Sequence, residues 1–148
     1  MRAQRRKHFQ VSRKVTNPSL LVGDYERSWA VRNLREAMVN LSIARERAEI
    51  LAVKHFSAIA MRKAQLAIQY VLGEPGHLDA VVTEAFLGRP IVQEPVLDLL
   101  AAIRAAIGRV SDPQSPFEKE SVLKVAEVIF NASSSIVEAA IGQRLKLD

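Results

Sequence analysis

Residues 25–72, YERSWAVRNLREAMVNLSIARERAEILAVKHFSAIAMRKAQLAIQYVL, contain neither glycine nor proline over 48 positions. Their abundant alanine, leucine, isoleucine, arginine, glutamate and methionine favour helix throughout. Each half repeats apolar residues every three or four positions, the pattern of a helix with one buried face: Val31, Leu34, Met38, Leu41 and Ala48, then Phe56, Ala60, Ala64, Ala67 and Val71. One straight helix of this length would measure about 70 Å, too long for a compact domain of this size. We therefore predict a helical hairpin with its corner at 50–55, where β-branched and aromatic residues cluster.

The remainder of the chain also predicts helices separated by turns. The sequence GEPG at 73–76 is a strong turn signal, and a short helix over 77–86 follows it. Pro95 suits the first turn of a helix that we expect to reach Ile107. Ser115 and Glu118 form a capping-box pattern that opens the last helix, which we expect to end near Leu145. The fold class is therefore all-α, an up-and-down bundle of about five helices.

Composition narrows the class of protein. The chain has 148 residues, 49% of them hydrophobic, which fits one domain with a real core. No segment has the roughly 20 uninterrupted apolar residues that cross a bilayer. The absence of cysteine excludes disulfides and thiolate chemistry and suits the cytoplasm, where we expect this protein.

Positive charge is concentrated at the N-terminus. Six of the 21 Lys and Arg lie within the first 14 residues, without any Asp or Glu, which leaves 15 bases against 16 acids in the rest. We therefore divide the chain into a flexible basic arm, residues 1–23, and one helical domain, residues 24–148. The arm predicts contacts with nucleic-acid phosphates through its six cations: Arg2, Arg5, Arg6, Lys7, Arg13 and Lys14. The alternative is a solvated tail that aids solubility or touches an acidic surface of its own oligomer.

A second group of cations surrounds the predicted corner: Arg45, Arg47, Lys54, His55, Arg62 and Lys63. Arg62 and His77 are our candidates for a ligand-binding pair, because a histidine beside an arginine is a suitable phosphate or nucleobase contact. The more ordinary interpretation, which we prefer, is exposed ion pairing with Glu46, Glu49 and Asp79.

Motifs for catalysis and cofactors are missing from the sequence. There is no HExxH and no glycine-rich phosphate loop. Ser133, Ser134 and Ser135 lie within a predicted helix with no histidine nearby, so we expect them to bond to the preceding turn or to permit close packing. We predict no catalytic residue, no metal site and no cofactor.

Residues 57–79, SAIAMRKAQLAIQYVLGEPGHLD, resemble the second helix of archaeal and bacterial HEPN (higher eukaryotes and prokaryotes nucleotide-binding) domains. In that family an Ala-Gln or Ala-Ala pair precedes an alanine-rich helix, which runs into a glycine-containing turn and a His-Asp-like pair. Here one residue separates His77 from Asp79. Residues 25–47 resemble the family's first helix and 117–132 its last, so the resemblance covers about residues 25–140.

The resemblance implies a five-helix bundle that forms a homodimer and works beside a minimal nucleotidyltransferase or acts on RNA. Catalytic members carry an arginine followed, after four to six residues, by a histidine, whereas in the helical domain Arg47 and His55 have seven residues between them. The chain therefore resembles a noncatalytic member, and we expect a module that binds nucleic acid or nucleotide rather than an enzyme. The alternative is a structural protein whose bundle docks the helices of a partner and whose arm contributes only charge. Amphipathic helices with apolar surface to spare also favour a two-fold homodimer.

Overall fold

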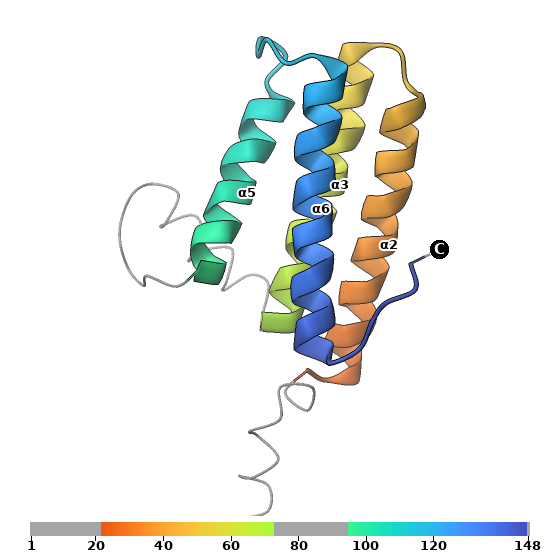
Figure 1. The fold of residues 1–148 in the computed structure, drawn as a ribbon, viewed down its shortest axis with the longest axis vertical. Coiled ribbons are helices and arrows are strands. Elements are labelled where there is room, and N and C mark those ends of the chain that lie inside the picture. Colours follow the sequence, from red (N-terminus) through yellow and green to blue (C-terminus); the bar gives the residue numbers. More distant parts are fainter. Residues whose placement is uncertain (1–21, 73–94, 148) are drawn as a thin grey trace, which may run out of the picture.

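The computed structural model describes residues 22–72 and 95–147 of the chain. They form four helices, α2 (Asp24–Glu46), α3 (Ile50–Leu72), α5 (Pro95–Ser111) and α6 (Lys119–Ile141), and no strand occurs within these two ranges. The four helices lie along one long axis and alternate in direction (Figure 1). The all-α prediction is confirmed. The predicted turn at 73–76, the helix at 77–86 and the arm up to residue 21 lie outside the described residues.

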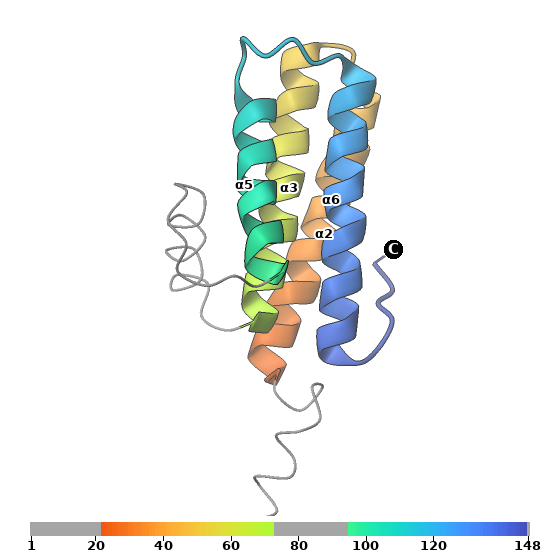
Figure 2. The ribbon, with the colours of Figure 1, turned by 60° about the vertical axis from the view of Figure 1, so that its left-hand side comes forward.

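Helix α3 is the centre of the bundle. It packs along α2, α6 and α5, whereas α5 touches α6 only marginally. Figure 2 shows α5 lying beside α3. A search of the described helices finds none that is long and apolar enough to span a membrane.

Alanines set the close packing between α2 and α3. Ala30, Ala37 and Ala44 follow one another at seven-residue intervals on α2, and each has 0% exposure. The two helices are antiparallel about a corner at 47–49, so residues equidistant from the corner face each other. Ala30 shares one buried cluster with Ala67, and Ala37 shares another with Ala60. Small side chains therefore line both sides of this contact. We call it the alanine seam: Ala30, Ala37 and Ala44 of α2 with Ala60 and Ala67 of α3.

The predicted core stripes are partly correct. Leu34, Leu41, Ala60, Ala64 and Ala67 are buried as expected. Val31, Met38, Phe56 and Val71 are only half-buried, and Ala48 is exposed because it lies in the corner rather than on a helix. The larger apolar residues flank the alanine seam instead of forming it.

The corner between α2 and α3 lies at 47–49, so the predicted position at 50–55 is wrong. Arg47 leaves the helix with extended backbone angles, φ −80° and ψ 139°, and its N–H donates to the Ala44 carbonyl. Its guanidinium lies 5.5 Å from the centre of the Phe56 ring. Because these contacts turn the chain before Ile50, the β-branched and aromatic residues that follow are all helical.

Other helix boundaries also differ from the predictions. α5 continues past Ile107 to Ser111, because Gly108 is accommodated within the helix. The capping box is not formed, since the Ser115 hydroxyl donates to the Asp112 carbonyl and α6 begins at Lys119. α6 ends at Ile141 rather than near Leu145, because Gly142 adopts a left-handed φ of 73° that ends the helix. The following residues fold back along the bundle (Figure 1), where Leu145 and Leu147 pack against the cluster containing Leu34 and Val137.

Two lysines hold backbone carbonyls at one end of the bundle. Lys119 Nζ donates to the carbonyls of Arg45 and Arg47 at the end of α2, at 2.9 and 2.6 Å. Lys54 Nζ donates to the carbonyls of Asp112 and Ser115 beyond α5, at 3.2 and 2.7 Å. A cation near a helix C-terminus is stabilising because the unpaired carbonyls there carry partial negative charge. Each lysine therefore ties the start of its own helix to the end of a neighbouring one.

Candidate functional site

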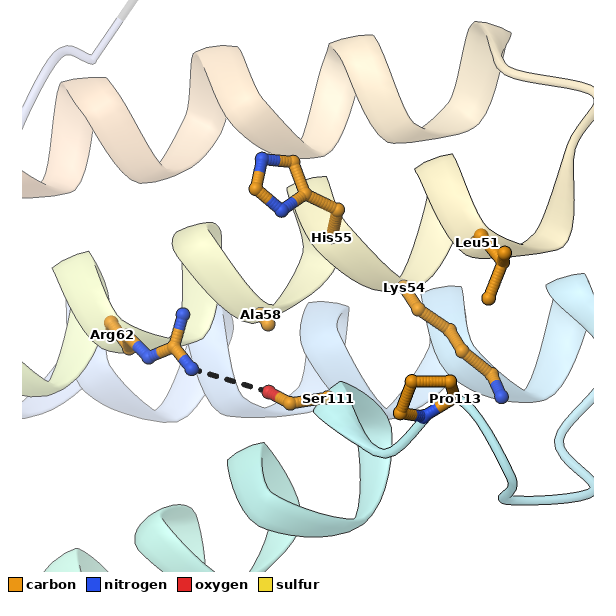
Figure 3. A pocket seen from close by; sticks show the side chains of 7 residues that line it. All are labelled: Leu51, Lys54, His55, Ala58, Arg62, Ser111 and Pro113. Atoms are coloured by element: carbon orange, nitrogen blue, oxygen red, sulfur yellow. Dashed lines mark hydrogen bonds between the residues drawn. The ribbon is translucent and has the colours of Figure 1, made fainter.

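A hollow of about 300 Å³ lies between α3 and the start of the α5–α6 connection (Figure 3), and is lined by Leu51, Lys54, His55, Ala58, Arg62, Ser111 and Pro113. The α3 residues share a face because they recur every three or four positions. Helix α3 contains no Asp or Glu at all. The hollow is therefore flanked by a helix whose formal charges are all positive.

Arg62 is the cation most open to a ligand in this hollow. Its side chain is exposed, and one Nη donates to the Ser111 hydroxyl at 3.3 Å. Within the described ranges no carboxylate pairs with this guanidinium. An arginine offers five N–H donors in a planar fork that matches phosphate or carboxylate oxygens. Arg62 thus keeps most of its donors for an anion entering the hollow.

Lys54 and His55 contribute differently to the same hollow. Lys54 is 4% exposed, and its ammonium is occupied by the two carbonyls described above. His55 is exposed, and in Figure 3 its ring is directed away from Arg62 and Ser111. Lys54 therefore positions the wall of the hollow, and His55 lies at its edge without converging on Arg62.

Among the described residues, the expected ion pairs with Glu46 and Glu49 do not form. Arg45 pairs instead with Glu127 of α6 at 2.9 Å, and Lys63 pairs with Glu36 of α2 at 2.8 Å. Arg45 and Lys63 therefore form ion pairs as expected, but with other partners. Helix packing brings Glu127 and Glu36 of neighbouring helices within reach of them. Asp79, the third expected partner, lies outside the described residues.

Glu36 is the acid most affected by this network. The hydrogen bond from Lys63, supported by one from Arg32, lowers the pKa of Glu36 below its usual 4.5, although partial desolvation opposes the shift. A lowered folded-state pKa means that the pair stabilises the fold above about pH 4.5 and loses this effect as the pH falls through the lower pKa. The side chains are 36–37% exposed, so solvent screening keeps the contribution small.

The other residues that the sequence suggested as functional lie partly outside the described ranges. His77 and the six arm cations lie outside the described residues, so the Arg62–His77 pair remains a prediction. Ser133 is fully buried and donates to the Ile129 carbonyl at 2.7 Å, which confirms its expected bond to the preceding turn. No group of three or more metal-ligating side chains occurs in the part of the chain that the structure describes.

An aromatic group where α2 begins and α3 ends was not predicted from the sequence. Tyr25 and Trp29 of α2 meet Tyr70 of α3, and the Trp29 and Tyr70 rings stack with centroids 5.9 Å apart. The four-residue spacing of Tyr25 and Trp29 placed them on one helix face and could have drawn attention to them. Their meeting with Tyr70, 41 positions beyond Trp29, depends on the register of the hairpin.

Comparison with known proteins gives no relative: no family model, no curated protein and no solved structure matches this chain. Neither these comparisons nor the described residues point to an enzymatic activity. The hollow around Arg62 is therefore interpreted from its own geometry.

Proposed function

We propose that this protein is a noncatalytic binding module that engages nucleic acid or nucleotide through phosphate groups. The observation that carries the proposal is the Arg62 guanidinium in the hollow, which donates to the Ser111 hydroxyl and pairs with no carboxylate of residues 22–72 and 95–147. Guanidinium groups bind phosphate with two parallel hydrogen bonds, and a hydroxyl can donate a third. The basic arm adds the sequence-independent attraction that nucleic-acid binding requires.

The shape of the hollow also suits a nucleotide. Leu51, Ala58 and Pro113 provide apolar surface next to the polar pair of Arg62 and Ser111. A volume of about 300 Å³ lies at the lower end of the range for small-molecule sites. One phosphate and part of an attached nucleoside fit these dimensions and this chemistry.

Replacement of Arg62 tests the proposal. In Arg62→Gln we expect binding of a nucleoside monophosphate to weaken by about tenfold to a hundredfold, because a charged hydrogen bond contributes about 1.5–3 kcal/mol. Arg35→Gln is the matched control, since Arg35 is also an exposed arginine but lies on α2, away from the hollow. Isothermal titration calorimetry measures both. Equal affinities in the two variants would remove the hollow from the proposal, and absence of any nucleotide or nucleic-acid binding by the full chain would favour the structural alternative.

We also propose that the module forms a two-fold homodimer in the cytoplasm, as the cysteine-free composition and the HEPN resemblance suggest, with a nucleotidyltransferase as a candidate partner. Large apolar side chains remain exposed on separate helices, among them Val39 at 54%, Leu51 at 58% and Val128 at 59%. Closed two-fold pairing is the commonest way to cover such surface. Light scattering should give twice the chain mass of 16.4 kDa, and a mass of 16.4 kDa across micromolar concentrations would refute the dimer.

A further inference from the structure

Three aromatic rings gather where α2 begins and α3 ends. Trp29 and Tyr70 stack at an interplanar angle of 14°, and Tyr25 meets both of them edge-on, at 6.2 and 6.5 Å. The stack joins α2 to α3, which explains why Trp29 and Tyr70 are half-buried. It does not explain Tyr25, which remains 64% exposed although two rings stand beside it.

One cation contacts this aromatic group. The Arg32 guanidinium lies 5.0 Å from the centre of the Trp29 ring, and its side chain is 64% exposed. Glu36, the acid next along this face, is already neutralised by Arg32 and Lys63. Asp24 and Glu26 flank Tyr25, but the six arm cations outnumber them.

Chain connectivity limits the distance between the last of these cations, Lys14, and the rings. Lys14 precedes Val22 by eight residues, and an extended chain of that length reaches about 30 Å at most. Val22 is itself buried, and Gly23 is the N-cap of α2, so the arm enters the bundle directly before Tyr25. A polymer bound at the rings is thus about 30 Å or less from the point that Lys14 can reach.

Arg62 and Tyr70 both lie on α3. The two residues are eight positions apart, which corresponds to about 12 Å along the helix axis. That distance is covered by two or three nucleotides of a single strand. No acid occurs on α3 between them to repel a phosphate backbone.

We propose that Tyr25, Trp29 and Tyr70 form a stacking platform for the bases of single-stranded nucleic acid. Tyr25 offers the ring surface on which a base stacks, while Trp29 and Tyr70 hold that ring in place and Arg32 meets the adjoining phosphate. Non-specific single-strand binding combines stacking on aromatic side chains with backbone neutralisation by nearby cations. The inference rests on the proposed nucleic-acid function and names the strand type and the surface that the strand uses. Duplex bases are already stacked on each other, so a duplex gains nothing from the platform.

The experiment compares variants of the full chain for binding of a fluorescein-labelled 12-nucleotide oligothymidine by anisotropy. Tyr25→Ala should weaken binding roughly tenfold or more, since stacking on one ring carries about that effect. Tyr25→Phe keeps the ring and should bind as the natural chain does. Ile50→Ala is the control, because Ile50 is 37% exposed at the start of α3, at the opposite end of that helix from Tyr70. Retained helical circular dichroism in each variant establishes that the bundle is intact.

Trp29 supplies a second, direct readout as the single tryptophan of the chain. Its emission should change as oligothymidine is added to the natural protein, because a base settles against the ring group that contains it. Binding that is unaffected by Tyr25→Ala, leaves Trp29 emission unchanged or is equally tight for a duplex of the same length overturns the platform while phosphate binding stands. A full chain that binds neither nucleotide nor oligothymidine overturns the platform and the proposed function together.

Discussion

A protein that lacks residues 2–14 should lose most of its affinity for nucleic acid, whatever the nucleotide sequence. These residues hold six cations and no acid, and the remaining chain has 15 bases against 16 acids. Each phosphate neutralised on a single strand contributes about 0.7 to the slope of log K against log salt, so six contacts contribute roughly 4. We therefore expect the slope measured between 50 and 200 mM salt to flatten by about that amount.

A second variant separates charge from chain length in this experiment. Replacement of all six cations by glutamine keeps the arm at its full length and should reproduce the deletion if phosphate contacts are responsible. Neither change should unfold the bundle, because the described core begins at Val22. Unchanged affinity and salt slope in the deletion would place the contact surface entirely on the bundle, around Arg62.

Enlargement of one alanine in the seam should have the largest effect on stability. In Ala37→Leu we expect a loss of about 1–3 kcal/mol in the free energy of unfolding, because a well-packed interface without space must shift to admit the larger side chain. Ala37 has 0% exposure, and by the register of the hairpin it faces Ala60, which has 1%. Urea denaturation followed by circular dichroism measures the change.

Ala139→Leu is the control for the seam. It makes the same chemical change at an exposed position of α6, where leucine is as compatible with helix as alanine is and meets no packed neighbour. We expect its free energy of unfolding to stay within about 0.5 kcal/mol of the natural protein's value. Equal losses in both variants would show that the seam has room and that its alanines do not set the distance between α2 and α3.

The sequence predicted the all-α class and the hairpin of α2 and α3 because apolar spacing and the absence of glycine and proline are local signals. It did not predict the alanine seam. Val31 and Met38 share the three-four spacing of Leu34 and Leu41 and were therefore assigned to the core, yet they are half-buried while Ala30 and Ala37 are fully buried. Close approach of two helices selects for small volume rather than hydrophobicity, and single-chain periodicity does not reveal which helix is the neighbour.

The candidate site was likewise predicted only in part from the sequence. Arg62 was identified from its residue type and lies in a hollow, whereas the role of Lys54 was not foreseen. A lysine near the start of a helix usually suggests an exposed charge, but Lys54 is buried because carbonyls from residues 112 and 115 reach it across the bundle. The corner was misplaced for a related reason, since Lys119 holds the end of α2 from a position more than 70 residues later. Tertiary contacts of this kind override local propensity.

The two lysines that hold carbonyl groups also suggest how distant relatives of this chain would be recognised. The compact ammonium of a lysine can donate to two carbonyls at once. The broader, planar guanidinium of arginine does not fit the same position. Surface positions accept many different residues, and positions in the alanine seam accept any small residue. Neither kind of position therefore gives a sequence pattern by which relatives could be recognised. Lysines at the positions of Lys54 and Lys119, one early in the second helix of the hairpin and one opening the last helix, should persist where the rest of the sequence has drifted.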